Sequence, residues 1–129
     1  MSEESVETAR KAHETFNRGD RDAWLALCDE DAELYSLRSQ LEGRPYRGHE
    51  GLRRFLVDLD EQWDYVRFGV REIRDAGEQV VVLTDFRARG GTSGVELDFP
   101  VGMVIRVRAG KITYASDPDG ALRAAGLGE

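Results

Sequence analysis

The stretch Glu96-Leu97-Asp98-Phe99-Pro100-Val101-Gly102-Met103-Val104-Ile105-Arg106-Val107 alternates between two kinds of residue. All of its odd-numbered residues are apolar, whereas its even-numbered residues include two acids, a proline, a glycine and an arginine. Successive side chains of a β-strand point to opposite faces, so this period of two predicts a strand of about 12 residues. One face of that strand is apolar throughout and is expected to face the interior of the protein.

Three further strands are expected beside it, joined by short turns. Tyr65 to Ile73 and Gln79 to Arg89 are separated by the turn Asp75-Ala76-Gly77-Glu78. Lys111 to Ser116 follows the turn Arg108-Ala109-Gly110. Hairpins of this kind join antiparallel strands, because a parallel pair needs a long crossover connection. An antiparallel sheet is therefore expected.

Helical spacing appears before this run of strands. Apolar residues recur at helical spacing over about residues 3–17, and Asp20 can cap a second short helix that includes Trp24. Residues 32–37 are expected to form a strand, and Gly48 opens a third helix. The order helix, helix, strand, helix and then four strands is typical of an α+β protein.

The length of the chain and its glycines define the expected shape. A chain of 129 residues is expected to form one domain over residues 1–129. Glycines such as Gly102 allow long strands to bend. We therefore expect a strongly curved antiparallel sheet that forms a cone around the N-terminal helices. The interior of such a cone is not filled by backbone and is a natural ligand site.

Charge and composition exclude several classes of partner. The net charge is -7 and basic residues alternate with acidic ones, as in Arg71-Glu72-Ile73-Arg74-Asp75, so nucleic-acid binding is not expected. No apolar run approaches the roughly 20 residues that span a bilayer, and the acidic N-terminus is unlike a signal peptide. We therefore expect a cytoplasmic protein without membrane contact. Cys28, the single cysteine, is expected to fill space in a helix rather than to act as a catalytic thiol.

Short motifs that share one family pattern are spread over nearly the whole chain. They are Phe16-Asn17-Arg18-Gly19-Asp20, Asp29-Glu30-Asp31-Ala32-Glu33-Leu34, Tyr46-Arg47-Gly48-His49-Glu50-Gly51-Leu52, Gly94-Val95-Glu96-Leu97, Gly110-Lys111-Ile112 and Ala121-Leu122-Arg123-Ala124-Ala125-Gly126-Leu127. Together they resemble the SnoaL-like branch of the nuclear-transport-factor-2-like superfamily, which has a cystatin-like α+β cone fold. The resemblance implies a cone-shaped cavity and a homodimer packed through the sheet.

The superfamily that this chain resembles includes enzymes that catalyse unrelated reactions, so the fold alone does not indicate which reaction to expect. Its members include ketosteroid isomerases, polyketide cyclases, epoxide hydrolases and dehydratases. In the isomerases a tyrosine, an aspartate base and a protonated aspartic acid share the chemistry. The matching positions of this chain hold Ala12, Ser36 and Met103, none of which can perform those steps. Ketosteroid isomerisation is therefore not expected.

The epoxide hydrolases of the superfamily use a buried network of acids and an arginine. Asp98 and Arg106 share one face of a strand, so a carboxylate–guanidinium pair is one interpretation. The alternative is that both residues, together with Glu96, form the polar outer face of that strand at a dimer interface.

The polyketide cyclases of the branch place an acid near the end of the last strand and support it with a histidine. The resemblance assigns this place to Asp117, and burial at an apolar mouth would favour its protonated form. The alternative is that Asp117 only caps the turn that it begins. His13 lies on the apolar side of the first helix and is the second candidate for proton transfer, unless it is a core histidine with one hydrogen bond. His49 is expected to be an exposed residue at a helix start.

The remaining candidates are expected to line the cavity. They are Phe16, Leu34, Ser36, Phe55, Leu59, Trp63, Phe86, Phe99, Val101, Met103 and Tyr114. The alternative for each of them is an ordinary core position. Two histidines without metal-ligand spacing predict no metal site, and no cofactor is expected.

Two hypotheses follow for the function. The first is a SnoaL-like protein that binds a small, mainly apolar molecule and acts on it as a cyclase, isomerase or hydrolase through a pocket carboxylate. The second is a module without catalysis that only binds such a molecule or forms a dimer. A cavity with polar groups arranged around a carboxylate favours the enzyme, whereas a wholly apolar or filled cavity favours the module.

Asp117 provides a direct test of the first hypothesis. If its carboxyl group transfers the proton, Asp117→Asn abolishes turnover of the molecule that co-purifies with the protein, because an amide cannot exchange a proton near neutral pH. Circular dichroism would show unchanged folding. An unchanged rate would remove Asp117 from the mechanism.

Overall fold

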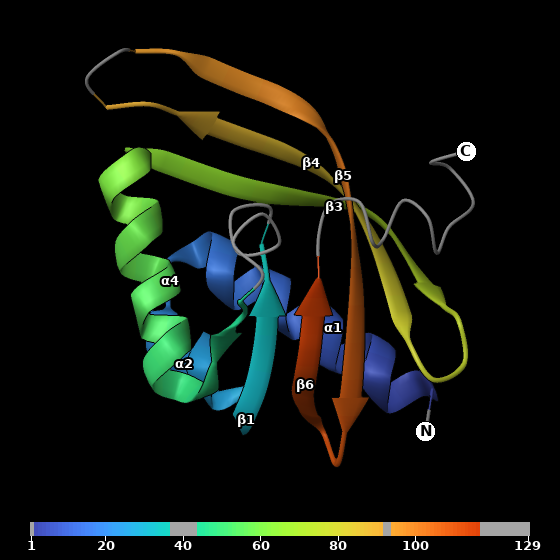
Figure 1. Ribbon diagram of the computed structural model, residues 1–129. Helices are drawn as coiled ribbons and strands as arrows, with labels where there is room; N and C mark the ends of the chain where they lie inside the picture. Colours follow the sequence, from blue (N-terminus) through green and yellow to red (C-terminus); the bar gives the residue numbers. More distant parts are fainter. Residues whose placement is uncertain (1, 37–43, 92–93, 117–129) are drawn as a thin grey trace.

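A computed structural model describes residues 2–36, 44–91 and 94–116 of the protein. Figure 1 shows a curved sheet that wraps around helices. The described elements are, in chain order, α1 (Ser2–Arg18), α2 (Arg21–Ala26), β1 (Cys28–Tyr35), β2 (Tyr46–Arg47), α4 (Gly48–Gln62), β3 (Tyr65–Asp75), β4 (Val80–Arg89), β5 (Glu96–Arg108) and β6 (Lys111–Ser116). The strands are hydrogen-bonded into one sheet in the order β2-β1-β6-β5-β4-β3.

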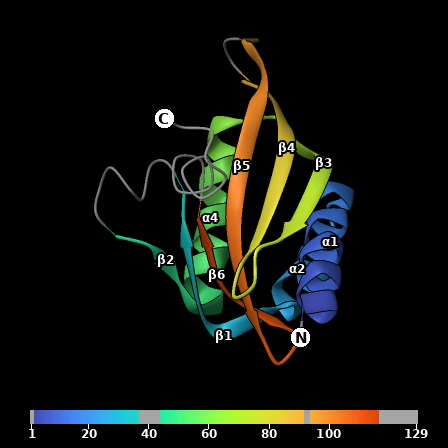
Figure 2. The same cartoon turned by 90° about the vertical axis from the view of Figure 1, so that its right-hand side faces the viewer.

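Strand β5 connects the two parts of this sheet. It pairs with β4 from Glu96 to Ile105 and with β6 from Val104 to Arg108. Figure 1 shows β5 running beside β6 and then bending over the helices. Figure 2 shows β4 and β3 on one side of β5, and β6 and β1 on the other. The expected α+β architecture, with a strongly curved sheet around the N-terminal helices, is confirmed.

One strand pair differs from the expectation of a wholly antiparallel sheet. Strands β1 and β6 are parallel, with Leu34 opposite Ala115. The argument from short turns applies only to strands that follow each other directly. Between β1 and β6 the chain passes through α4, β3, β4 and β5, and this long connection permits a parallel pair. Strand β1 also begins at Cys28, earlier than the predicted residue 32, because the acidic run that follows Cys28 masks its alternation.

The apolar face of β5 packs over the helices along part of its length. Val101 and Ile105 are buried on this face, opposite Thr84 and Val80 of β4. Thr84 is 1% exposed, and its hydroxyl group donates a hydrogen bond of 2.9 Å to the carbonyl oxygen of Val101. A buried hydroxyl group without such a partner would destabilise the sheet, so this bond makes threonine acceptable in the core.

The opposite face of β5 is charged. Asp98 lies 3.3 Å from Arg87, and Glu96 lies 3.9 Å from Arg89, both on the neighbouring strand β4. These side chains are more than half exposed, and exposed ion pairs add little stability. The guanidinium group of Arg106 lies over an aromatic ring instead of against Asp98. The polar outer face is therefore the interpretation that this arrangement favours over a buried acid–arginine network.

Two glycines bring the start of α4 close to the sheet. Gly48 has a φ of 70°, and a Cβ atom added to it would lie 3.1 Å from the backbone oxygen of Glu30. A Cβ atom on Gly51 would lie 3.1 Å from the backbone carbon of Tyr46. The motif Gly48-His49-Glu50-Gly51 is thus required by the close contact between the helix and strands β1 and β2.

Asn17 fastens the end of α1 to the outer edge of the sheet. Its side-chain nitrogen donates a 2.7 Å hydrogen bond to the carbonyl oxygen of Phe68, and its side-chain oxygen accepts a 2.9 Å bond from the amide of Phe68. Strand β3 is an edge strand, so both backbone groups would otherwise lack a strand partner. Asn17 therefore determines where α1 lies relative to β3.

The Asn17→Ala variant tests this connection. It removes both side-chain bonds and leaves two backbone groups of Phe68 unpaired, so we expect the free energy of unfolding to fall by about 1–3 kcal/mol. Urea denaturation followed by circular dichroism measures the change. Glu14→Ala is the matched control, because Glu14 is an exposed residue of the same helix. Equal midpoints for the two variants would show that the Asn17 bonds are not needed.

Candidate functional site

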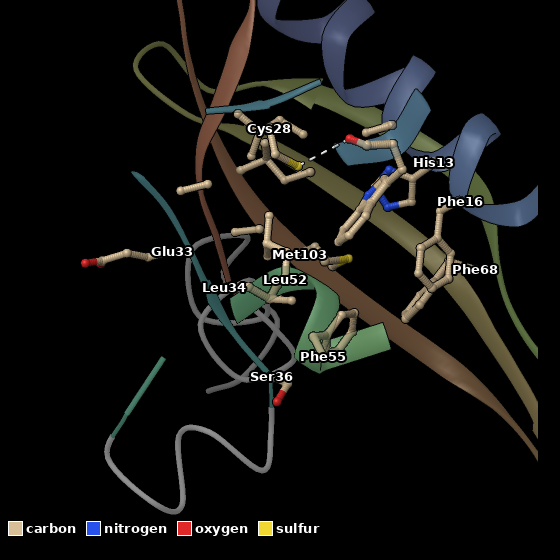
Figure 3. A pocket seen from close by; sticks show the side chains of 16 residues that line it. His13, Phe16, Cys28, Glu33, Leu34, Ser36, Leu52, Phe55, Phe68 and Met103 are labelled. Atoms are coloured by element: carbon tan, nitrogen blue, oxygen red, sulfur yellow. Dashed lines mark hydrogen bonds between the residues drawn. The ribbon is translucent and has the colours of Figure 1, made fainter. Parts of the chain in front are cut away.

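A cavity of about 70 Å³ lies between the helices and the concave face of the sheet. Its volume is about half of the roughly 150 Å³ at which an apolar cavity has been found to hold benzene. Figure 3 shows the side chains that surround it. They are Ala12, His13, Phe16, Trp24, Cys28, Ala32, Glu33, Leu34, Ser36, Leu52, Phe55, Phe68, Met103, Ile105, Ile112 and Ala115.

Some of the expected site residues lie together around this cavity. His13 and Phe16 project from α1, and Phe55 projects from α4. The sheet contributes Met103 from β5, and β1 with the residue after it contributes Leu34 and Ser36. Asp117 lies outside the described residues, so its role stays a prediction.

Three of the expected aromatic residues lie together outside the cavity. The ring centroid of Phe86 is 5.2 Å from that of Phe99 and 6.4 Å from that of Trp63. It is also 5.2 Å from Phe68, which lines the cavity. Phe99 is 42% exposed, in contrast to the expectation, because the β4–β5 hairpin extends past the residues that surround the cavity. Alternation identifies the face of a strand correctly but not the point at which that face leaves the core.

Tyr114 lies on the convex face of the sheet, away from the cavity. It is opposite Arg106 of β5, whose guanidinium carbon is 4.5 Å from the centre of the Tyr114 ring. The register shifts between Arg106 and Val107, so Ile112 and Ala115 line the cavity although they differ in parity. Such a bulge reverses the faces of the residues that follow it, and alternation in the sequence cannot locate it.

Leu59 and Val101 also lie outside the cavity lining. Leu59 follows Phe55 by one turn of α4 and is half-buried. Val101 is 5% exposed and packs in the sheet opposite Thr84. Both take part in ordinary packing, which was the alternative for every expected lining residue.

The sequence analysis missed several lining residues, and one is an acid. Glu33 contributes to the wall, but its carboxylate is bound to Arg47 and accepts a 3.4 Å hydrogen bond from the hydroxyl group of Tyr35. Figure 3 shows this side chain pointing away from the other lining residues. Phe68 could have been found from the alternation of its strand, since Val66, Phe68 and Val70 are all apolar. Trp24 belongs to a helix of only six residues, and the face of so short a helix did not identify it as part of a cavity wall.

His13 is a buried, neutral residue of the cavity wall. It is 6% exposed, and its Nδ1 atom lies 3.0 Å from the carbonyl oxygen of Ala9. A carbonyl oxygen only accepts hydrogen bonds, so Nδ1 holds the proton and Nε2 has a free electron pair. Burial lowers the pKa of the imidazole below its usual value, with a smaller opposing effect of the Ala9 bond. At neutral pH the ring is therefore an acceptor towards the cavity and not a cation.

Burial disfavours the thiolate, which is the reactive form of the cysteine in the wall. Burial raises the pKa of the Cys28 thiol to about 12, with a smaller opposing effect of Lys111. The thiol group lies 3.5 Å from the carbonyl oxygen of Trp24. The backbone oxygen of Cys28 lies 2.8 Å from the Nε2 atom of His49, which is half-buried and not exposed as expected. His49 thus joins the start of α4 to β1 and does not reach the cavity lining.

The three positions that match the catalytic groups of the isomerases all lie on the cavity wall. They are Ala12, Ser36 and Met103. These three positions therefore face the cavity, but their side chains cannot transfer the protons of a ketosteroid isomerisation.

A polar cluster behind the wall supports Phe55. Tyr46 donates a 2.6 Å hydrogen bond to the carboxylate of Asp58, which is 8% exposed and also lies 3.2 Å from Arg54. The ring of Tyr46 packs on Phe55 with centroids 5.3 Å apart. A bond this short between a hydroxyl group and a carboxylate is charge-assisted. The cluster holds β2 against α4 and keeps Phe55 directed at the cavity.

The described part of the chain contains neither a metal-binding cluster nor a membrane-spanning helix. Within residues 2–36, 44–91 and 94–116, no group of three or more His, Cys, Asp or Glu side chains could hold a metal ion. No helix in these ranges is both long and apolar enough to cross a lipid bilayer.

Comparison with solved structures identifies similar folds. An NTF2-like protein of unknown function from Burkholderia pseudomallei shares 21% of residues over 93% of this chain and 95% of its own, with a TM-score of 0.78. TerC, co-crystallised with polyporic acid, shares 19% over 98% of this chain and 99% of its own, with a TM-score of 0.79. An uncharacterised cystatin-fold protein from Novosphingobium aromaticivorans shares 23% over 90% of this chain and 97% of its own, with a TM-score of 0.72.

The comparison with family models places the chain more narrowly. No curated protein matches the sequence. The model of the SnoaL-like domain matches residues 9–115, a range that contains all the helices and strands around the cavity except the ends of α1 and β6. The chain belongs to the family of SnoaL-like domains.

Proposed function

We propose that the cavity binds a small, mainly apolar molecule. The observation that supports this proposal is an unfilled space of about 70 Å³ in the middle of an otherwise packed core. Protein interiors are normally packed as densely as organic crystals, so a space of this size is uncommon in a small domain. Small side chains on the wall, such as Ala12, Ala32 and Ala115, leave this space open.

The chemistry of the wall supports binding more strongly than acid–base catalysis. Among the described lining residues, Glu33 has the one carboxylate, and that carboxylate forms an ion pair with Arg47 and points away from the cavity. The Cys28 thiol is protonated at neutral pH because burial raises its pKa to about 12. His13 is the remaining residue of the described wall that could accept a proton. Catalysis as a cyclase, isomerase or hydrolase therefore depends on Asp117 and stays a prediction.

The expected ligand is small, but the cavity can adapt. Met103 is unbranched and flexible, so a change of its rotamer can enlarge the space. TerC, whose fold is similar, was co-crystallised with polyporic acid. That neighbour supports the proposal that this fold can hold a small organic molecule.

The Ala12→Leu variant tests whether the cavity is the binding site. The larger side chain would enter the cavity and displace a ligand, so we expect native mass spectra of the protein purified from its host to lose the bound small molecule. Ala26→Leu is the matched control, because it introduces the same side chain at an exposed helical position. A small molecule retained equally by both variants, or absent from the unmodified protein, would contradict the proposal.

Acid titration tests the neutral state of His13. Its pKa is lower in the folded protein than in the unfolded chain, so its contribution to stability is complete above about pH 6.5 and is lost as pH falls towards the folded-state pKa. In that window we expect His13 to lower the free energy of unfolding by up to about 1.4 kcal/mol for each unit by which the pH falls. Urea denaturation between pH 7.5 and 5.5, values chosen around the usual histidine pKa of about 6.5, measures the slope. The slope should decrease in His13→Phe, and an identical slope in both proteins would show that His13 is not buried as a neutral ring.

A further inference from the structure

Two polar ring atoms of the cavity wall have no hydrogen-bond partner among the described residues. The first is the Nε2 atom of His13, since the Nδ1 atom is used by the carbonyl oxygen of Ala9. The second is the indole N–H group of Trp24. The contact between Trp24 and Cys28 involves the backbone oxygen of Trp24 and leaves the indole ring unbonded. Neither ring atom forms a hydrogen bond with any residue in the described ranges. The two side chains are 6% and 9% exposed, so bulk water does not satisfy them.

Unpaired polar groups are unusual at this depth. Buried side-chain donors and acceptors in native proteins almost always have a hydrogen-bond partner, so a group without one needs a physical explanation. The indole N–H group can only donate, and the Nε2 atom of the neutral imidazole can only accept. Besides Ser36 and Glu33, the described wall is apolar, and these two rings add one donor and one acceptor to it.

Both groups belong to one cluster of rings. The ring centroid of Phe16 is 5.7 Å from that of Trp24 and 5.6 Å from that of Phe68. The imidazole of His13 packs edge-on against Phe68 with centroids 6.4 Å apart. All four rings line the same cavity. The donor and the acceptor are thus held by rigid aromatic packing on α1 and α2.

We propose that the ligand of this cavity is a small, mainly apolar molecule with one hydroxyl group, which donates to His13 Nε2 and accepts from Trp24 Nε1–H. This inference rests on the proposed function. A hydroxyl group is both donor and acceptor, so one group can satisfy both ring atoms. A carbonyl or ether oxygen could satisfy only Trp24. A carboxylate would be buried without a cation, because no Lys or Arg is found among the described lining residues.

Phenol and toluene form a matched pair of test compounds, because they have nearly the same shape and differ in the hydroxyl group. A cavity without polar partners favours toluene, since burying an unpaired hydroxyl group is unfavourable. With Met103 changing its rotamer to make room for the ring, we expect the unmodified protein to bind phenol at least as tightly as toluene, measured by NMR titration of the protein.

The variants His13→Phe and Trp24→Phe each remove one polar atom and keep an aromatic ring in the cluster. For each variant we expect the affinity for phenol relative to toluene to fall about tenfold, the usual effect of losing one buried hydrogen bond. Circular dichroism shows whether each variant is folded. If one of the two does not fold, the other still provides the test.

The outcomes separate this inference from the proposed function. Toluene binding without phenol binding would overturn the inference and leave the proposed function intact. So would a phenol-to-toluene ratio that neither substitution changes, which would mean that ordered water occupies the two polar groups. Met103→Ala enlarges the cavity and serves as the size control. If neither compound binds to the unmodified protein or to Met103→Ala, the proposed function itself fails.

Discussion

Backbone pairing along both edges of β5 holds the two parts of the cone together. The strand is bonded to β4 over most of its length and to β6 near its end, so one bent strand belongs to two differently oriented regions of the sheet. The helices lie on the concave side because the apolar face of β5 must be covered. Asn17 and the glycines at the start of α4 then fix the helices against this sheet by close backbone contacts. Removing either edge of β5 would separate the cavity walls.

The cavity results from side-chain size more than from backbone shape. Val80 and Val82 are fully buried in the core beside it, and Leu52 and Ile105 are fully buried in its wall. The alanines of the wall are too short to fill the remaining space, while large rings stand at its margin and prevent collapse. Aromatic contacts continue from Phe16 through Phe68 and Phe86 to the exposed Phe99, so the same packing that supports the wall reaches the surface.

Burial also determines the chemistry of the wall. It keeps His13 neutral and Cys28 protonated, because each charged form would lose its hydration. The side chain of Glu33 points away from the cavity and forms an ion pair with Arg47. The result is a surface that excludes charge but still offers two directional polar atoms. Such a surface distinguishes ligands by shape and hydrogen bonding.

Patterns in the amino-acid sequence were enough to predict the order of the elements, the face of β5 that meets the helices, the Asp20 cap of α2 and membership of the SnoaL-like family. These features are local, since alternation, helical spacing and glycine motifs depend on neighbouring residues. The three-dimensional structure was needed for the parallel pairing of β1 with β6, the outward position of Tyr114, the exposure of Phe99 and the place of Trp24 in the cavity wall. Each of these depends on a register, a bulge or a contact between distant segments. The packing that stabilises these features joins residues that are far apart in the sequence, so no short stretch of sequence predicts them.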